Sequence, residues 1–136
     1  MSHILIVGAQ GGLGSVAKEL FLSKEWRVTC SDRSMLDITK RDDVLKFVTE
    51  LRPNLILNAA AFNNVDAAED QAQRSFVLAV NGFAPGFLSE AAQEVGARMI
   101  HVSTDYVFSG EKKEGYKEDD ESSPISFYGE SKLTGE

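Results

Sequence analysis

Four short apolar runs alternate with stretches that carry apolar side chains at helical spacing, and this alternation limits the fold more than any other feature. Each run has the length of a strand that is buried on both faces of a parallel sheet. The runs lie at residues 4–7, 27–30, 55–57 and 98–102. Helices are expected over about residues 12–23, 39–52, 70–95 and from 127 onward. Such units predict an α/β fold with a doubly wound parallel sheet, in the strand order 3-2-1-4.

Local signals indicate where two of these helices begin or change direction. Thr39 and Asp42 have the spacing of a capping box, which predicts a helix N-terminus there. Three residues interrupt the helical pattern of residues 70–95, and they are Gly82, Pro85 and Gly86. We therefore expect a kinked helix, or two helices end to end.

Composition excludes several classes of protein. The 136 residues have the size of one domain, and a net charge of −7 argues against nucleic-acid binding through bulk electrostatics. No apolar run approaches the roughly 18 residues of a membrane-spanning helix, and the N-terminus lacks a signal-peptide pattern. The single cysteine, Cys30, forms no internal disulfide, and Asp66, Glu69 and Asp70 are best explained as acids that complement a helix dipole. We expect a cytoplasmic protein that does not bind a membrane and has no metal site within this chain, while a metal at a dimer interface stays open.

Gly8, Gly11 and Gly14 follow the first strand in the spacing G-x-x-G-x-x-G and open the first helix. A tight turn at Gly8 and a bare backbone at Gly11 let a pyrophosphate approach the amide groups of the helix N-terminus. Gly14 lets the helix pack closely on the strand. Because the motif lies between a strand and a helix, it predicts a Rossmann-type NAD(P)-binding domain over residues 1–136.

The second strand leads into two residues that favour different cofactors. Asp32 lies 18 residues beyond Gly14, near the spacing of an acid that binds the ribose hydroxyls of adenosine. Arg33 could instead pair with the 2′-phosphate of NADPH. A solvated Asp-Arg turn without a cofactor role also stays open. We expect NADPH as the cofactor, with NADH tolerated.

Tyr128 and Lys132 stand four residues apart at the start of the last expected helix, so they share one helical face. An unperturbed phenol has a pKa near 10, and a neighbouring ammonium favours its phenolate form. Ser103 and Thr104 follow the fourth strand, where the Thr104 hydroxyl could hold a substrate carbonyl. A Tyr-x-x-x-Lys pair alone is common on solvated helices, but with the glycine loop it predicts an acid–base set for carbonyl reduction.

These motifs resemble the extended short-chain dehydrogenase/reductase superfamily and, more narrowly, the dTDP-4-dehydrorhamnose reductase family. The glycine loop, Thr104, Tyr128 and Lys132 carry the broader resemblance. Four strings carry the narrower one, and they are Asn-Ala-Ala-Ala at 58–61, Val-Asp-Ala-Ala-Glu at 65–69, Ser-Thr-Asp-Tyr-Val-Phe at 103–108 and Tyr-Gly-Glu-Ser-Lys-Leu-Thr-Gly-Glu at 128–136. The similarity spans the whole chain.

The resemblance implies that the nucleotide-sugar substrate is dTDP-6-deoxy-L-lyxo-4-hexulose, whose 4-keto group is reduced to give dTDP-L-rhamnose. Tyr128 would donate the proton, Lys132 beside it would bind the nicotinamide ribose, and Thr104 would hydrogen-bond the sugar carbonyl. Tyr106 would face the sugar, or pack as an ordinary aromatic residue. The other implied cofactor contacts are Gln10, Gly11, Gly12 and Leu13 at the pyrophosphate, Asp37 and Ile38 at the adenine, Ala59, Ala60 and Ala61 along the ribose and nicotinamide, and Asn81 near the nicotinamide.

Family members are about twice as long as this chain. The resemblance therefore implies an incomplete dinucleotide-binding domain without the carboxy-terminal substrate domain, and it allows a homodimer. Glu136 lies inside the last expected helix, four residues after Lys132, with no stop signal beyond it. The fourth strand would then be an open edge of the sheet. Two alternatives stay open: a non-catalytic NADP-binding regulatory subunit similar to methionine adenosyltransferase beta, or an inactive fragment.

Overall fold

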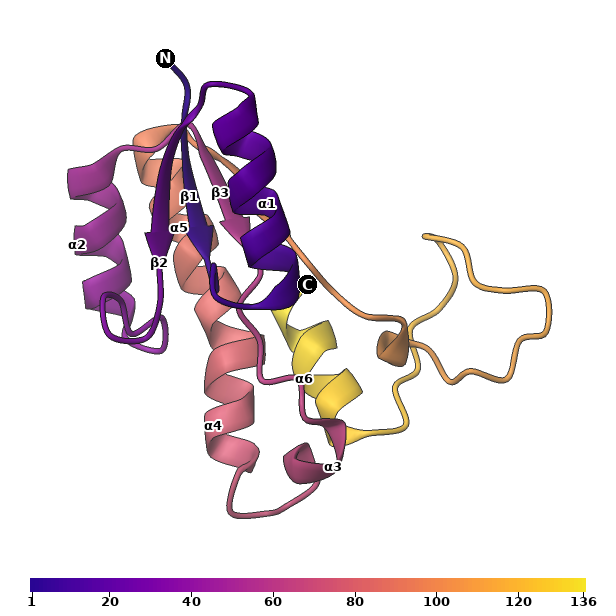
Figure 1. The fold of residues 1–136 in the computed structure, drawn as a ribbon. Helices are drawn as coiled ribbons and strands as arrows, with labels where there is room; N and C mark the ends of the chain where they lie inside the picture. The colour runs from indigo at the N-terminus through magenta and orange to yellow at the C-terminus, as the bar shows by residue number, and fades with distance from the viewer.

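The computed structural model describes residues 1–136 and contains one parallel sheet with helices on both faces (Figure 1). The strands are β1 (His3–Val7), β2 (Arg27–Ser31), β3 (Leu55–Asn58) and β4 (Arg98–His101). The strand order is β2-β1-β3-β4, and the register aligns Val7 with both Ser31 and Asn58. The expected α/β class is confirmed, and β4 lies at an edge of the sheet as expected.

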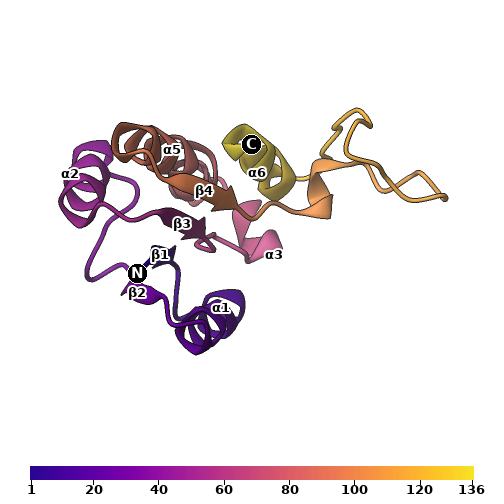
Figure 2. The ribbon, with the colours of Figure 1, turned by 90° about the horizontal axis from the view of Figure 1, so that it is seen from above.

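The helices follow the sequence pattern closely. They are α1 (Gly12–Ser23), α2 (Arg41–Leu51), α3 (Val65–Ala68), α4 (Arg74–Leu78), α5 (Ala84–Val95) and α6 (Phe127–Gly135), with a π-helical turn η1 (Ala79–Phe83) and a 3-10 turn η2 (Asp105–Val107). Helix α1 covers one face of the sheet, whereas α2 and α5 cover the other (Figure 2). Residues 109–126 extend away from this body in both views. None of the helices combines the length and apolar character that a membrane span requires.

The expected strand order of 3-2-1-4 is wrong, because β3 lies beside β1 and not beyond β2. In a right-handed crossover, the face on which the helix lies determines the direction in which the chain moves along the sheet. Helix α2 packs against α5 on the face opposite α1. The chain must therefore move back across β1 to reach β3. This reversal creates a switch point between β1 and β3, where open α/β sheets bind ligands.

Side chains of β1 alternate between two hydrophobic cores. The core under α2 and α5 contains Leu5, Val7, Val44, Val48 and Leu88, and the core under α1 contains Ile4, Ile6, Ala17 and Leu57. Each of these residues is at most 8% exposed. Burial on both faces holds β1 at the centre of the sheet, so its carboxyl end is a fixed support for the glycine loop that follows.

The expected capping box at the start of α2 is wrong. Lys40 is the N-cap residue, and it makes no side-chain cap hydrogen bond. The Thr39 hydroxyl instead donates to Asp37 Oδ1 at 2.6 Å, and the Thr39 amide donates to the same oxygen at 3.1 Å. A carboxylate that bonds donors two residues ahead competes with a helix cap. Asp42 still lies in the first turn of α2, where its charge complements the helix dipole.

The expected interruption of the long helix is a π-helical turn between α4 and α5. Pro85 has no N–H to bond the Asn81 carbonyl four residues earlier, and its ring disfavours a regular α-helical turn there. In η1 the Ala84 amide bonds the Ala79 carbonyl, five residues back. A Cβ atom added at Gly135 of α6 would collide with the Asn81 carbonyl oxygen. Helix α6 therefore packs backbone to backbone against the irregular turn.

Candidate functional site

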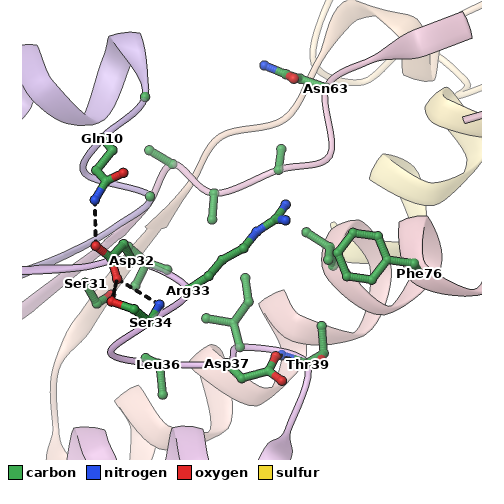
Figure 3. Close-up of a pocket in the computed structure, with 18 residues that line it drawn as sticks. Gln10, Ser31, Asp32, Arg33, Ser34, Leu36, Asp37, Thr39, Asn63 and Phe76 are labelled. Carbon is green, nitrogen blue, oxygen red and sulfur yellow. Dashed lines mark hydrogen bonds between the residues drawn. The ribbon is translucent and has the colours of Figure 1, made fainter. Parts of the chain in front are cut away.

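A cavity of about 710 Å³ opens at the carboxyl ends of β1, β2 and β3 (Figure 3). Its lining includes most of the cofactor residues expected from the sequence: Gly8, Gln10, Gly11, Asp32, Arg33, Asp37, Ile38, Ala59, Ala60 and Ala61. Six of the expected residues lie outside the lining, and they are Gly12, Leu13, Gly14, Asn81, Tyr128 and Lys132. The cavity thus occupies the switch point between β1 and β3, as ligand sites of this fold class do.

Sequence reasoning missed part of the lining, namely Val7, Ser31, Ser34, Leu36, Thr39, Asn63, Phe76 and Val80. Ser31 and Ser34 flank the Asp32–Arg33 pair, so their place at a strand end was a usable signal. Phe76 and Val80 come from α4 and η1, and no local pattern connects these elements to the cavity.

Two glycines hold the loop after β1 close to the sheet. Gly8 has a φ of +79°, and a Cβ atom there would lie 2.7 Å from the Ala60 amide nitrogen. A Cβ atom at Gly14 would collide with the Gly8 carbonyl oxygen. Gly11 is the N-cap residue of α1 and offers no side-chain acceptor. The N–H groups of the first turn of α1 can therefore bond an anion placed beside Gly11.

Asp32 is held in place by its own turn (Figure 3). Its Oδ1 accepts from the Ser34 amide at 2.8 Å and from the Ser34 hydroxyl at 2.6 Å, and its Oδ2 accepts from Gln10 Nε2 at 2.6 Å. The hydrogen bonds from Ser34 are the largest cause that lowers the pKa of Asp32. The ionised carboxylate can accept further hydrogen bonds from hydroxyl groups at the cavity edge.

The Arg33 side chain extends across the cavity toward α4 (Figure 3). Its guanidinium carbon lies 5.3 Å from the centre of the Phe76 ring, a cation–π distance. The planar guanidinium suits phosphate recognition. The end of β2 therefore presents a carboxylate for ribose hydroxyls and a guanidinium for a phosphate on neighbouring residues.

The residues present fit a dinucleotide. The glycine loop leaves a cradle next to Ala60 that any side chain at Gly8 would fill. Ser31 Oγ, buried at the cavity wall, has no hydrogen-bond partner within the protein. Asp37 and Ile38, where the resemblance expects the adenine, also line the cavity.

Helix α6 is joined to the segment that leaves β4. Lys132 Nζ donates to the Val102 carbonyl oxygen at 2.7 Å, and the Ser103 hydroxyl donates to the Glu136 carboxylate. Lys132 is only 2% exposed, and this burial lowers its pKa, although the Glu136 charge acts in the opposite direction. One of the three ammonium donors is used by Val102, so the others can bond ligand hydroxyls.

Tyr128 of α6 contacts the segment after β4 at Tyr106, two residues after Thr104. The rings of Tyr106 and Tyr128 lie edge to face with centroids 5.6 Å apart. Thr104 Oγ1 accepts from the Tyr106 amide at 3.2 Å and so caps η2. Gly129 permits this approach, because a Cβ atom there would collide with the Tyr106 carbonyl oxygen. The structure thus brings Thr104, Tyr106 and α6 together, while the chemical roles expected for them stay predictions.

Asn81 has every side-chain group bonded within the protein. Its Oδ1 accepts from the Phe62 amide at 2.8 Å, and its Nδ2 donates to the Phe62 carbonyl and to Ser131 Oγ, both at 3.0 Å. The residue is 1% exposed. Asn81 therefore fixes the loop after β3 against α6, and its expected place near the nicotinamide stays a prediction.

Comparisons with known proteins agree with this geometry. The RmlD substrate binding domain model matches residues 1–136. The chain is 43% identical to the dTDP-4-dehydrorhamnose reductase of Aggregatibacter actinomycetemcomitans and 40% identical to that of Mycolicibacterium smegmatis. These matches cover 100% and 98% of this chain but 46% and 40% of the relatives.

Solved structures give the same result. The chain resembles a dTDP-4-dehydrorhamnose reductase from Clostridium acetobutylicum, with a TM-score of 0.94 and 42% identity, over 98% of this chain and 47% of that one. It resembles the Bacillus anthracis dTDP-4-dehydrorhamnose reductase in complex with NADP, with a TM-score of 0.93 and 38% identity, over 99% and 48%. The chain spans about half the length of the curated relatives it matches. Because the family model covers every residue, the chain belongs to the RmlD substrate binding domain family.

Proposed function

We propose that this chain is the cofactor-binding part of an NADPH-dependent reductase that acts on the 4-keto group of a dTDP-6-deoxy sugar and yields dTDP-L-rhamnose. The observation that carries the proposal is the pairing of a dinucleotide-sized cavity at the β1–β3 switch point with α6, which holds Tyr128 and Lys132 against the segment after β4. Relatives named dTDP-4-dehydrorhamnose reductase support it. The carboxy-terminal substrate domain would lie in the part of the relatives that this chain does not span.

The proposed mechanism divides the work among three side chains. Bound NADPH supplies a hydride to the sugar carbonyl carbon. Thr104 donates a hydrogen bond to the carbonyl oxygen and fixes its orientation. Tyr128 donates a proton to that oxygen as it becomes a hydroxyl. Lys132 keeps a positive charge beside the phenol and bonds ribose hydroxyls with the donors that Val102 leaves unused.

Turnover by the full-length protein tests this function. NADPH oxidation, followed at 340 nm in the dTDP-4-keto sugar assay, should require Tyr128. We expect Tyr128→Phe to lose at least about 100-fold in kcat, in line with the removal of a general acid. Tyr116→Phe is the matched control, because its hydroxyl bonds Ser109 in the segment that extends away from the body. Unchanged turnover in Tyr128→Phe would show that the mechanism is wrong.

The cofactor preference is a separate proposal. Arg33 lines the cavity beside Asp32 and has no carboxylate within salt-bridge distance. Its guanidinium can therefore pair with the 2′-phosphate of NADPH. We expect Arg33→Ala to raise the KM for NADPH about tenfold and to leave the KM for NADH within about twofold. Equal changes for both cofactors would refute this role.

A second candidate is NADP binding without catalysis, as in a regulatory subunit. The observation that favours it is that Tyr128 and Lys132 lie outside the lining of the cavity. A full-length protein that binds NADPH but does not reduce the keto sugar would support this candidate. For the 136-residue chain itself, the test is a thermal shift with millimolar NADPH, and the absence of a shift would identify an inactive fragment.

The setting and assembly are further proposals. A reducing, cytoplasmic location suits a chain whose single cysteine, Cys30, is a free thiol, and a net charge of −7 disfavours nucleic-acid partners.

We propose a homodimer, because two-fold dimers are the commonest assemblies of soluble enzymes. Light scattering on the full-length protein measures this state, and a monomer mass would refute it.

A further inference from the structure

The N-terminus of α6 is held by a side chain from a distant part of the chain. The amide of Phe127, the first residue of α6, donates to Glu69 Oε1 at 2.7 Å. Glu69 is the C-cap residue of α3, 58 positions earlier. The local cap, Ser126, has its hydroxyl bonded to the Gly129 amide at 3.1 Å. Glu69 therefore supplies an acceptor that the residues next to α6 do not provide.

Arg74 binds both members of this contact. Its Nη2 lies 3.8 Å from Glu69 Oε2, and its guanidinium carbon lies 4.7 Å from the centre of the Phe127 ring. Phe127 is thus held at its backbone by Glu69 and at its ring by Arg74. We call Glu69, Arg74 and Phe127 the α6 clamp.

The clamp adjoins Tyr128, the next residue along α6. The Tyr128 side chain packs with Ala68 and Val77 of α3 and α4, the elements that also carry the clamp. On the other side, Gly129 lies against the Tyr106 carbonyl with no room for a side chain. The first turn of α6 is therefore confined between two walls. The direction of the Tyr128 ring depends on where the Phe127 backbone is held.

The clamp matters because α6 has little intrinsic stability. It has nine residues, and a helix of that length is marginal in water without tertiary support. It also follows residues 109–126, which extend away from the body (Figure 2) and reach its first turn with the Ser126 cap. A carboxylate at a helix N-terminus forms a charge-assisted hydrogen bond and complements the helix dipole. Loss of Glu69 would leave the first turn free to unwind or rotate.

We propose that Glu69 is a positioning residue for Tyr128, with Arg74 holding the Glu69 carboxylate in place. The kinetic part of this inference rests on the proposed function, in which Tyr128 donates the proton. Glu69 lies outside the lining of the cavity, so it acts through the Phe127 backbone and not on a ligand. Substitution should therefore slow turnover without weakening cofactor binding.

Three variants of the full-length protein test the inference. Glu69→Ala removes the acceptor, Glu69→Gln keeps a neutral oxygen at the same position, and Asp66→Ala removes an exposed charge from α3 without a contact to α6. We expect Glu69→Ala to lower kcat about tenfold or more with the KM for NADPH within about twofold, because small displacements of a reacting group are costly. The kcat of Glu69→Gln should stay within about threefold of the wild-type kcat. The kcat of Asp66→Ala should equal the wild-type kcat.

Hydrogen exchange of the amides in residues 126–130 provides a readout that needs no substrate. Exchange there should accelerate in Glu69→Ala and not in Asp66→Ala. A Glu69→Ala protein with wild-type kcat while Tyr128→Phe is inactive would overturn the positioning role and leave the proposed function intact. If the wild-type protein does not reduce the keto sugar, the proposed function fails, and unchanged exchange in Glu69→Ala would then overturn the clamp as well.

Discussion

Alanine substitutions of three glycines after β1 should separate packing of the loop from cofactor binding. A Cβ atom at Gly14 would collide with the Gly8 carbonyl oxygen and would lie 2.7 Å from Ala9 Cα. Both contacts are to backbone, so no side-chain rotation relieves them. Overpacking of this kind costs about 1–3 kcal/mol and sometimes more, and we expect about 3 kcal/mol for Gly14→Ala. That corresponds to a fall in Tm of roughly 5 °C in a protein about twice the length of this chain.

Alanine substitutions at Gly11 and Gly12 should have different effects from Gly14→Ala. A Cβ atom at Gly11 would meet the Gly8 carbonyl oxygen at 3.4 Å, an ordinary contact, but Gly11 lines the cavity. Gly11→Ala should therefore keep its Tm and weaken NADPH binding about tenfold or more, because the pyrophosphate needs a bare backbone there. Gly12 starts α1 and has nothing within 4 Å. Gly12→Ala should gain about 0.5 kcal/mol in stability and, because Gly12 lies outside the lining of the cavity, should weaken NADPH binding less than Gly11→Ala does.

Thermal unfolding followed by circular dichroism, together with NADPH titration by fluorescence, measures both quantities on each variant of the full-length protein. The three variants should differ, with stability lost at Gly14, binding lost at Gly11, and stability gained with a smaller loss of binding at Gly12. A Gly14→Ala protein whose Tm stays within about 2 °C of wild type would show that the loop can move away from the added carbon. Wild-type affinity in Gly11→Ala would show that the pyrophosphate does not bind beside this residue.

Two further substitutions test buried polar groups. Asn81→Ala should lower the free energy of unfolding in urea by about 2–4 kcal/mol, because it leaves the Phe62 amide and carbonyl buried without their partner. Asn64→Ala is the control. It removes a cap at the exposed start of α3 and should lower this free energy by about 1 kcal/mol. Burial, with a smaller contribution from the Lys132 charge, lowers the pKa of His101 below its ordinary value near 6.5. As the pH falls, the unfolded chain therefore binds the His101 proton before the folded chain does. The contribution of His101 to the free energy of unfolding is complete above about pH 6.5 and is lost as the pH falls below it. His101→Gln should reduce this loss between pH 7 and 5, and an unchanged pH dependence would refute the assignment to His101.

The sequence predicted those parts of the fold that local patterns encode. The bounds of α1 and the start of α6 at Phe127 agree with expectation, since the glycine loop precedes the first and the Ser126 cap precedes the second. The order of the strands was not predictable in this way, because α1 and α2 are both amphipathic and neither carries a signal for one face of the sheet. Thr39 failed as a cap for a related reason. Its hydroxyl had two acceptable partners, and Asp37 lay closer along the chain.

The same distinction applies to the candidate site, where the sequence predicted residues that local patterns place and missed residues that tertiary packing places. Residues at strand ends, such as Asp32 and Ala60, were found because their position in the chain fixes their position in the fold. Phe76 reaches the cavity from α4, which depends on the tertiary packing of a helix that begins far along the chain. Glu69 was expected to complement the dipole of its own helix, and this is wrong, because Glu69 is the C-cap residue of α3. Its carboxylate instead accepts from the first amide of α6, a contact across 58 residues that no local spacing encodes.

Asn81 links the two halves of the site into one unit. Ala59, Ala60 and Ala61 line the cavity, and the next residue, Phe62, has its amide and carbonyl bonded to the Asn81 side chain. The same Asn81 nitrogen donates to Ser131, which precedes Lys132 on α6. Because these bonds are buried, each partner would be costly to leave unpaired. The cavity wall and α6 therefore cannot shift independently, so the separation between a bound dinucleotide and Lys132 is set by one buried amide.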